Sequence, residues 1–188
     1  MPRETLVRVA SAAGRARDYF LSQFTPGVGF IVDARDLCCY YKAPMMLLAG
    51  GRRKEADALL NVIVTKFMQE EGDFKSSVVL KSIKPEYSEF WIYTNGWILR
   101  AANQLRKREM LEAGLAYTDR YRQVETGGFL THRIDSQDGV TDVLTTAHFG
   151  LFHLEAGRED IARQAGGYLC RVISKQPDLT DGLYIRIN

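Results

Sequence analysis

Residues 140–174, VTDVLTTAHFGLFHLEAGREDIARQAGGYLCRVIS, decide the fold. The segment up to Leu154 carries Asp142 as its one charged residue, whereas the segment after Ala156-Gly157-Arg158 is amphipathic and rich in charge. A helix that is apolar on nearly all sides must be covered on nearly all sides, but a helix with a charged face can meet water. The stretch therefore predicts a helical hairpin with a covered inner helix and an exposed outer helix.

The same plan occurs twice upstream. Residues 37–50 hold only Lys42 as a charge and residues 90–99 hold none, and charge-rich segments follow at 52–69 and 106–122. Three corners that combine glycine with an aromatic residue close the units, and their aromatic residues recur every 55 positions: Gly72-Asp73-Phe74, Gly127-Gly128-Phe129 and Gly182-Leu183-Tyr184. A period of this size is typical of stacked helical hairpins. We predict one all-α domain over residues 1–188, with a leading helix over 5–24 and about three hairpins.

The expected helix limits follow from capping and breaking residues. Asp33 and Ser88 are placed to begin inner helices over 33–49 and 88–105, with a kink at Pro44. A third inner helix is expected from about Thr141. The outer partners are expected over 53–69, 109–122 and 159–174. Residues 76–80 fit either a short strand or a packed loop.

Composition narrows the function. With 25 basic and 23 acidic residues the formal charge is +2, far from the basic surface of a dedicated nucleic-acid-binding protein. We see no signal peptide and no apolar run long enough to span a membrane, so a cytoplasmic protein is expected. Three cysteines, two of them adjacent, lack the spacing of a zinc site or a disulfide framework. We expect reduced, buried thiols.

The hinges, which are the turns between the two helices of a hairpin, resemble those of a known family when they are taken together with the corners. Ala49-Gly50-Gly51-Arg52 precedes Glu55-Ala56, and Ala156-Gly157-Arg158 precedes Ile161-Ala162. With the three corners, these motifs resemble the α/α toroids over residues 29–188. This architecture is shared by terpenoid cyclases, protein prenyltransferases, six-hairpin glycosidases, uronate lyases, and acylglucosamine and glucuronyl epimerases. The resemblance implies a toroid or an open half-toroid.

The chain departs from that architecture in size. Such toroids usually close with five to seven hairpins, and this chain offers about three. An open arc exposes apolar end faces, which repeat proteins normally cover. Two copies in a homodimer, or a missing C-terminal half, would complete the ring.

The resemblance places a central cavity near the N-terminal ends of the inner helices. Polar and aromatic side chains share one face at each expected end: Asp33, Asp36 and Tyr40 with Tyr41 beside it on the first helix, Glu89, Tyr93 and Trp97 on the second, and Thr145 and His148 with Asp142 at the mouth on the third. We predict that they surround one small-molecule site.

This set suits proton transfer. A carboxyl group in a dry pocket has a raised pKa and can donate a proton, while a phenol or imidazole can accept one. Asp36 is our candidate acid, with Asp33 beside it, and His148 or Tyr41 is our candidate base. Asp33-Ala34-Arg35-Asp36 is similar to the Asp-rich acid motif of squalene-type cyclases but lacks its third carboxylate. Tyr40, Tyr93, Trp97, Thr145, Asp142 and Glu89 are our candidate substrate contacts.

Each candidate also has a structural interpretation. Asp33 and Asp36 can cap a helix, His148 can be a buried histidine, and the aromatic residues can be core. His153 and His132 are expected to face solvent. No metal-site or nucleotide-binding signature is present in the sequence, so neither metal nor cofactor is expected.

We therefore predict an isomerase, cyclase or lyase that uses acid/base chemistry without a cofactor. A carbohydrate epimerase or polysaccharide lyase is one alternative. A helical-repeat module that binds another protein, or completes a ring as a subunit, is the other.

Overall fold

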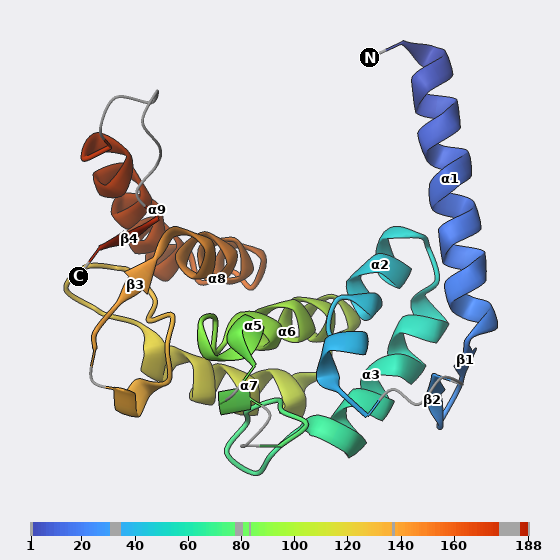
Figure 1. Ribbon diagram of the computed structural model, residues 1–188, viewed down its shortest axis with the longest axis horizontal. Helices are drawn as coiled ribbons and strands as arrows, with labels where there is room; N and C mark the ends of the chain where they lie inside the picture. The colour runs from blue at the N-terminus through green and yellow to red at the C-terminus, as the bar shows by residue number, and fades with distance from the viewer. Residues whose placement is uncertain are drawn as a thin grey trace.

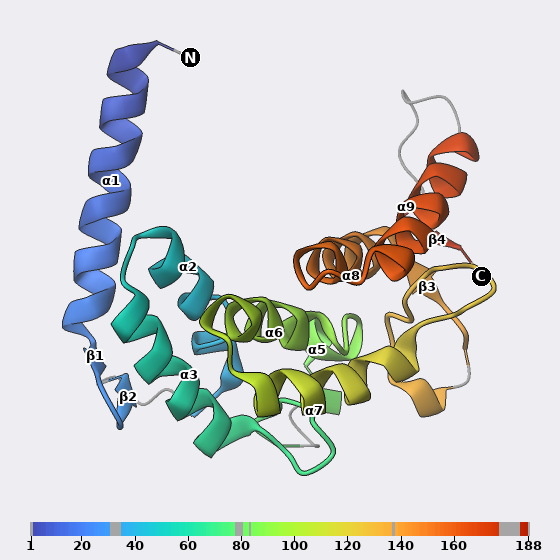
Figure 2. The same ribbon diagram turned by 180° about the vertical axis from the view of Figure 1, so that it is seen from behind.

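Helical hairpins follow a leading helix in the computed structural model, which describes residues 2–30, 35–77, 81–82, 84–136, 138–176 and 185–187. The leading helix is α1 (Arg3–Ser22). The hairpins pair α2 (Ala43–Ala49) with α3 (Arg53–Phe67), α6 (Tyr93–Leu105) with α7 (Arg108–Thr118), and α8 (Val143–Glu155) with α9 (Glu159–Ser174). Together they form an open arc, with α1 and α9 rising at its two ends (Figure 1). The view from behind gives the same outline (Figure 2).

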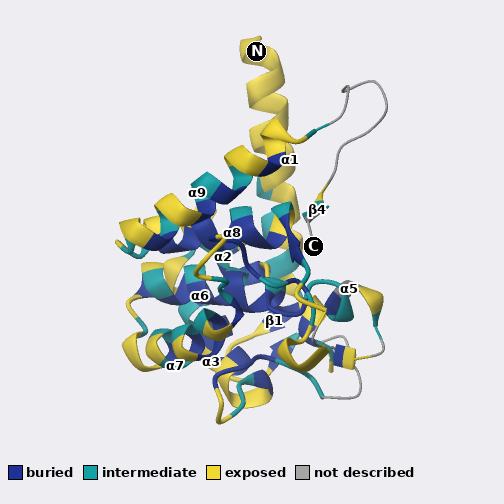
Figure 3. Cartoon of the chain, turned by 90° about the vertical axis from the view of Figure 1, so that its left-hand side faces the viewer, coloured by how far each residue is buried: buried dark blue, intermediate teal, exposed yellow. Residues whose placement is uncertain are grey.

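The first members of the hairpins form a row. Helix α6 packs against both α2 and α8, and the hydrophobic core lies between this row and the second members. More than half of α6 and α8 is buried, whereas α7 and α9 bury only a minority of their residues. Figure 3 shows the contrast between dark-blue α6 and α8 and the mostly yellow α1. The expected contrast between covered inner helices and exposed outer helices is therefore seen in the second and third hairpins, whereas α2 and α3 bury similar shares of their residues.

The three hinges share one backbone design. One of the first two residues after each inner helix has a positive φ: Gly51 (73°), Arg106 (60°) and Gly157 (75°). The next amide donates to the carbonyl five residues back, from Arg52 to Leu47, from Lys107 to Ala102 and from Arg158 to His153, at 2.8–2.9 Å. These are Schellman C-caps, which satisfy carbonyls that the helix end leaves free. The repeat predicted from the sequence is therefore present in the hinge geometry.

The corners also repeat. Phe74 and Phe129 are fully buried and form isolated antiparallel bridges with Met68 and Arg122, respectively. A Cβ at Gly72 would overlap the carbonyl of Ala113 in α7, and the backbone there has φ = 89°. Each of these constraints requires glycine at that corner. The third predicted corner, 182–184, lies outside the described residues.

The all-α prediction holds for the main architecture only. Short antiparallel pairs join β1 (Phe24–Thr25) to β2 (Gly29–Phe30) and β3 (Thr141–Asp142) to β4 (Arg186–Ile187). Further short elements are η1 (Leu37–Cys39), α5 (Pro85–Ser88), η2 (Asp119–Tyr121) and η3 (Ile134–Ser136). The described chain is therefore mostly helical with minor strands.

The predicted starts of two inner helices were wrong. Helix α2 begins at Ala43, after the 3-10 helix η1, and α6 begins at Tyr93, five residues after Ser88. Pro44 lies in the first turn of α2, where a missing amide donor costs nothing, so it kinks no helix. Neither helix has a side-chain cap at its start. Buried residues before each start, such as Leu37 and Ile92, hold the chain in non-helical loops.

The two ends of the arc leave apolar side chains in water. No residue of α1 is buried, and Leu6, Val7 and Val9 are about half exposed or more. At the other end α8 exposes Leu144, Leu151 and Leu154. Across the described part of the chain, no helix is long and apolar enough to cross a membrane.

Candidate functional site: an aromatic and cationic cluster on the inner row

Four of the predicted site residues meet on the inner row. The ring of Tyr93 lies 5.1 Å from His148, 6.2 Å from Tyr41 and 6.3 Å from Trp97, measured between centroids. Trp97 and His148 are themselves 5.0 Å apart. Tyr41 follows η1, Tyr93 and Trp97 are one turn apart on α6, and His148 comes from α8. We call these four residues together with Lys42 the aromatic cluster.

Lys42 lies over this cluster. Its ammonium is 5.3 Å from the ring of Tyr41 and 5.7 Å from each of the rings of Tyr93 and Trp97. These distances are within the range of cation–π attraction. Lys42 is exposed and makes no ion pair with the described residues. Lys42 is not among the predicted site residues, although it is the one charge in residues 37–50.

Arg100 supplies a second cation nearby. Its guanidinium lies 5.4 Å from the ring of Trp97 and binds Glu155 through two hydrogen bonds of 2.8 and 2.5 Å. Arg100 lies seven residues after Tyr93, so the helical period places both on one face of α6. Because Glu155 already neutralises Arg100, Lys42 carries the positive charge that is free for a ligand.

His148 is held in a tight slot. It is 8% exposed, and a Cβ at Gly96 would overlap its Cδ2 and Nε2 atoms. Burial, with help from the Arg100 and Lys42 charges, lowers the pKa of His148 to about 3. The imidazole is therefore neutral at pH 7.

Two buried ring nitrogens of the cluster lack a protein partner. Neither Trp97 Nε1 nor His148 Nε2 makes a hydrogen bond within the described structure. A buried polar group without a partner costs about 1–3 kcal/mol. Such a group calls for an explanation, such as a bound water, an ion or a functional role.

Asp36 has a different setting from the one predicted. Its carboxylate accepts hydrogen bonds from Tyr87 (2.6 Å), Ser76 (3.2 Å) and the amide of Cys38 (3.2 Å), and it pairs with Lys84. Burial raises its pKa, but Lys84, Tyr87 and the Cys38 amide outweigh this and lower it to about 2. An ionised, fully partnered carboxylate is a poor proton donor. The prediction of Asp36 as the acid was wrong, and it caps η1 instead.

Three predicted substrate contacts are structural. Tyr40 is 1% exposed and packs between Phe30 and Phe67, with centroids 4.8 and 5.1 Å away. Asp142 is 1% exposed and caps α8 by accepting from the amide of Thr145 at 2.7 Å. Thr145 itself is fully buried. Asp142 therefore does not lie at the mouth of a cavity, because the short β3–β4 pair covers it.

Glu89 and Asp33 do not join the cluster. Glu89 precedes α6, so it is not on the helical face of Tyr93 and Trp97, and it pairs with Arg186 at 2.5 Å. Its pKa is lowered, chiefly by that contact. Asp33 lies outside the described residues.

A buried polar network near the start of α6 was missed. Asp73 is fully buried and accepts hydrogen bonds from Lys81 (2.5 Å), Asn95 (3.0 Å) and the amide of Phe74 (2.8 Å). The Lys81 ammonium lies 4.7 Å from the ring of Trp91, whose Nε1 donates to Tyr117 at 2.9 Å. Burial lowers the pKa of Lys81 to about 8, and the Asp73 charge opposes this effect. We call this the Asp73 network.

Two further expectations about polar residues were wrong. His153 is fully buried and stacks on Phe129 with centroids 5.7 Å apart, because the second corner folds over the end of α8. The cysteines Cys38, Cys39 and Cys170 are free but exposed. His132 is half-buried between Glu89 and Asp138.

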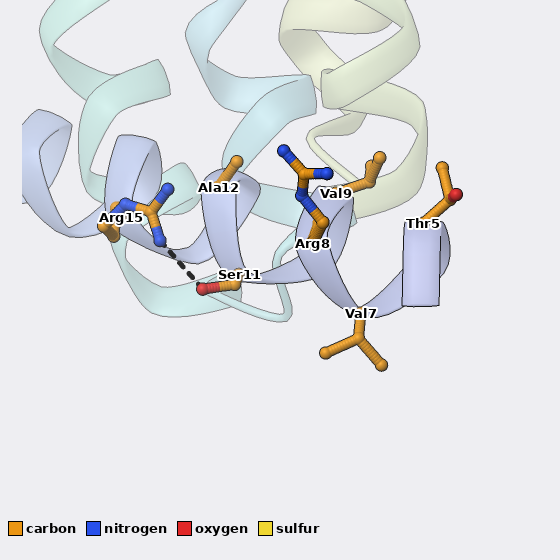
Figure 4. A pocket seen from close by; sticks show the side chains of 7 residues that line it. All are labelled: Thr5, Val7, Arg8, Val9, Ser11, Ala12 and Arg15. Carbon is orange, nitrogen blue, oxygen red and sulfur yellow. Dashed lines mark hydrogen bonds between the residues drawn. The ribbon is translucent and has the colours of Figure 1, made fainter. Parts of the chain in front are cut away.

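Several hollows lie elsewhere on the molecule. One of about 540 Å³ follows α1 and is lined only by residues of that helix, which Figure 4 shows from close by. Others of about 630 and 530 Å³ lie beside the first and second hinges. A hollow lined by one helix is an uncovered helix face, whereas the aromatic cluster combines three elements on an open surface.

Comparison with protein-family models, curated proteins and solved structures found no match. The chemistry of the cluster must therefore be judged from its own geometry. Aromatic faces, one free cation and a neutral imidazole suit a ligand that has both an apolar face and a negative charge.

Proposed function

We propose that the protein binds a small anionic organic molecule of the sugar-acid class on the aromatic cluster. One observation carries the proposal: the exposed Lys42 ammonium has no carboxylate partner among the described residues and lies over three aromatic rings. The C–H face of a sugar ring fits an aromatic wall, and its carboxylate pairs with an ammonium. The open surface suits modest affinity, because it buries less of a ligand than an enclosed pocket.

The reaction that suits this site is an isomerisation or elimination without metal or cofactor. In such a step the C–H bond next to the carboxylate breaks, a base takes the proton, and the electron pair moves into the carboxylate. Lys42 stabilises the negative charge that develops. His148 is the base in this proposal, and the negative charge of a bound carboxylate raises its pKa toward the useful range.

The open arc supports a further part of the proposal, that the hairpins belong to an α/α toroid. Repeating hinges, repeating corners and a row of charge-poor helices are what such a ring requires. The ligand then lies on the side of the arc that faces the ring centre.

Binding is tested by titration with glucuronate, with glucose as the neutral control. We expect glucuronate to bind and Lys42→Met to weaken binding at least about tenfold, a loss of about 1.4 kcal/mol. Lys54→Met removes an exposed lysine from α3 and should leave the affinity unchanged. Equal affinity of Lys42→Met and the wild type, or no binding of glucuronate by the folded wild type, contradicts the proposal.

The reaction is tested separately by proton exchange. In heavy water, glucuronate should lose the NMR signal of the proton next to its carboxylate when the protein is present. His148→Asn should stop this exchange while binding persists. Binding without exchange in the wild type leaves a binding protein and removes the enzyme.

A non-catalytic interaction module is supported by another observation. Leu144, Leu151 and Leu154 are about half exposed on α8, and apolar side chains of α1 are also exposed at the other end. Two copies joined end to end would cover both surfaces and complete a ring. Sedimentation at several concentrations tests this, because Leu151→Glu should abolish a dimer that the wild type forms. A wild type that remains monomeric rejects it.

A further inference from the structure

Two adjacent thiols lie at the surface on η1, apart from the aromatic cluster. Cys38 and Cys39 are both exposed and free, and their sulfur atoms are 3.8 Å apart. Both side chains therefore leave the same short turn close together. The third cysteine, Cys170, lies on α9.

The turn that carries the pair is fixed at both ends. Leu37 and Tyr40, on either side, are each 1% exposed. The Leu37 amide donates to Ser76 at 2.8 Å, and the Tyr40 amide donates to the Leu37 carbonyl at 2.9 Å. Asp36 caps the turn and is itself held by Lys84 and Tyr87. Preorganisation of this kind lowers the entropy cost of a chelating contact.

The geometry favours a bridging atom over a direct disulfide. Neighbouring Cα atoms are about 3.8 Å apart, below the usual range of about 4.4–6.8 Å for cystine. A vicinal disulfide is therefore strained, whereas a third atom can join the two sulfurs without closing the S–S distance. Partial loss of hydration, together with Cys39 and Asp36, raises the pKa of Cys38 to about 11 although the residue is exposed.

We propose that Cys38 and Cys39 form a dithiol site that chelates one trivalent arsenic atom of a monosubstituted organoarsenical. Soft thiol ligands select soft, thiophilic centres. With phenylarsine oxide, two S–H bonds break, two As–S bonds form, and the arsenic-bound oxygen leaves as water with both protons. Arsenic remains trivalent, so no oxidant or reductant is needed.

The number of thiols in the site determines which arsenic compounds it binds most tightly. The organic group of a monosubstituted arsenical occupies the third position on arsenic, so two thiols suffice. Within the described residues, no group of three or more histidine, cysteine or acidic side chains is arranged to hold a metal ion. Inorganic arsenite, which gains from a third thiol, should bind this pair more weakly than phenylarsine oxide.

The test uses the full, reduced chain and phenylarsine oxide, with intact mass as the readout. We expect one adduct per chain whose mass gain equals the reagent minus one water. Cys38→Ser and Cys39→Ser should each lower the affinity at least about 100-fold, because the second bond is intramolecular in the wild type. Cys170→Ser is the matched control and should bind like the wild type. A small dithiol should reverse the adduct, and a monothiol should not.

Several results would overturn the proposal. They are retention of wild-type affinity in both Cys38→Ser and Cys39→Ser, loss of binding in Cys170→Ser, and failure of the reduced wild type to bind while three thiols titrate freely. All three cysteines are exposed, so these variants are expected to fold. The result is independent of sugar-acid binding, because neither Cys38 nor Cys39 belongs to the aromatic cluster.

Discussion

Two lysine–tryptophan contacts in this protein differ in how their polar groups are partnered. In the Asp73 network, Lys81 is 2% exposed and pairs with Asp73, and the Trp91 indole donates to Tyr117. In the aromatic cluster, Lys42 is exposed and unpaired within the described residues, and the Trp97 indole has no acceptor there. Similar residue types thus serve two purposes. In the Asp73 network the Lys81 ammonium and the Trp91 indole both have partners, although one carboxylate oxygen of Asp73 lacks a hydrogen bond. This network fixes the first corner against α6, while the aromatic cluster leaves its lysine and its indole unpartnered and so has capacity for a ligand.

Replacement of Lys81 should cause the largest loss of stability. Lys81→Met removes the nearer of the two cations beside the buried Asp73 and leaves Lys75, whose ammonium is 3.6 Å from the other carboxylate oxygen. Breaking one partner of a buried ion pair costs about 3–5 kcal/mol, and Lys75 should hold the loss toward the lower end of this range. Urea unfolding measures the loss. Adding Asp73→Asn to Lys81→Met should recover part of it, since the stranded charge disappears. If Lys81→Met lowers the free energy of unfolding by less than about 1 kcal/mol, the buried Lys81–Trp91 contact and the exposed Lys42–Trp97 contact do not differ in their importance for stability.

Acid should weaken the fold through its buried histidines. His148 and His153 have folded-state pKa values of about 3 and about 4, below the ordinary 6.5. Their contribution to stability is complete above pH 6.5 and is lost as the pH falls, because the unfolded chain takes up protons that the folded chain cannot. Each contributes a slope of up to about 1.4 kcal/mol per pH unit.

This slope is measured by urea unfolding between pH 7 and pH 5, well above the pKa of about 2 for Asp36. The variant His148→Gln should reduce the slope by about half, because His153 remains. Stability that does not change over this range would place both imidazoles in water and remove the buried slot beside Gly96.

A methyl group in the slot that holds the His148 ring should cause a moderate loss of stability. Gly96→Ala places a methyl group where the His148 ring lies, and overpacking of this kind costs about 1–3 kcal/mol. Helix propensity favours alanine by about 1 kcal/mol, so a rise in melting temperature would mean that the ring moves freely. The matched control Gly166→Ala, in α9, has open space at the same position and should stabilise the protein.

Replacement of Lys42 should change stability least. Lys42→Met removes an exposed cation, and surface cation–π contacts contribute about 0.5–1 kcal/mol, partly offset by the added apolar contact of methionine. We expect a change in the free energy of unfolding within about 0.5 kcal/mol. Comparison with Lys81→Met, the same substitution in the Asp73 network, tests the contrast directly. A loss as large as that of Lys81→Met would make Lys42 a structural residue.

The sequence predicts the outer helices and hinges better than the loops. The outer helices lie near the expected residues because an amphipathic period is a local signal. The hinges after α2 and α8 were predicted because a glycine that ends a helix, here Gly51 and Gly157, is also a local signal. Arg106 shows that the hinge geometry does not require glycine, since it adopts φ = 60°. The inner helices start late because buried residues such as Leu37, which are distant in sequence from their partners, fix the preceding loops.

Contacts between residues distant in sequence also explain which parts of the candidate site could not be predicted. Helical spacing placed Tyr93 and Trp97 on one face, and the toroid resemblance placed them beside Tyr41 and His148. The structure brings these four residues together. Asp36 was misread because its partners Lys84 and Tyr87 are about 50 residues away and give no local signal. Lys42 was overlooked because one charge in an apolar segment has no pattern.

The two tryptophans provide the most direct measurement, because each contributes one indole N–H signal to an NMR spectrum. The account predicts that titration with glucuronate shifts the Trp97 signal progressively, leaves the Trp91 signal in place and has no effect on Trp97 in Lys42→Met. A Trp97 signal that does not move, or a Trp91 signal that moves instead, would contradict a ligand site on the aromatic cluster.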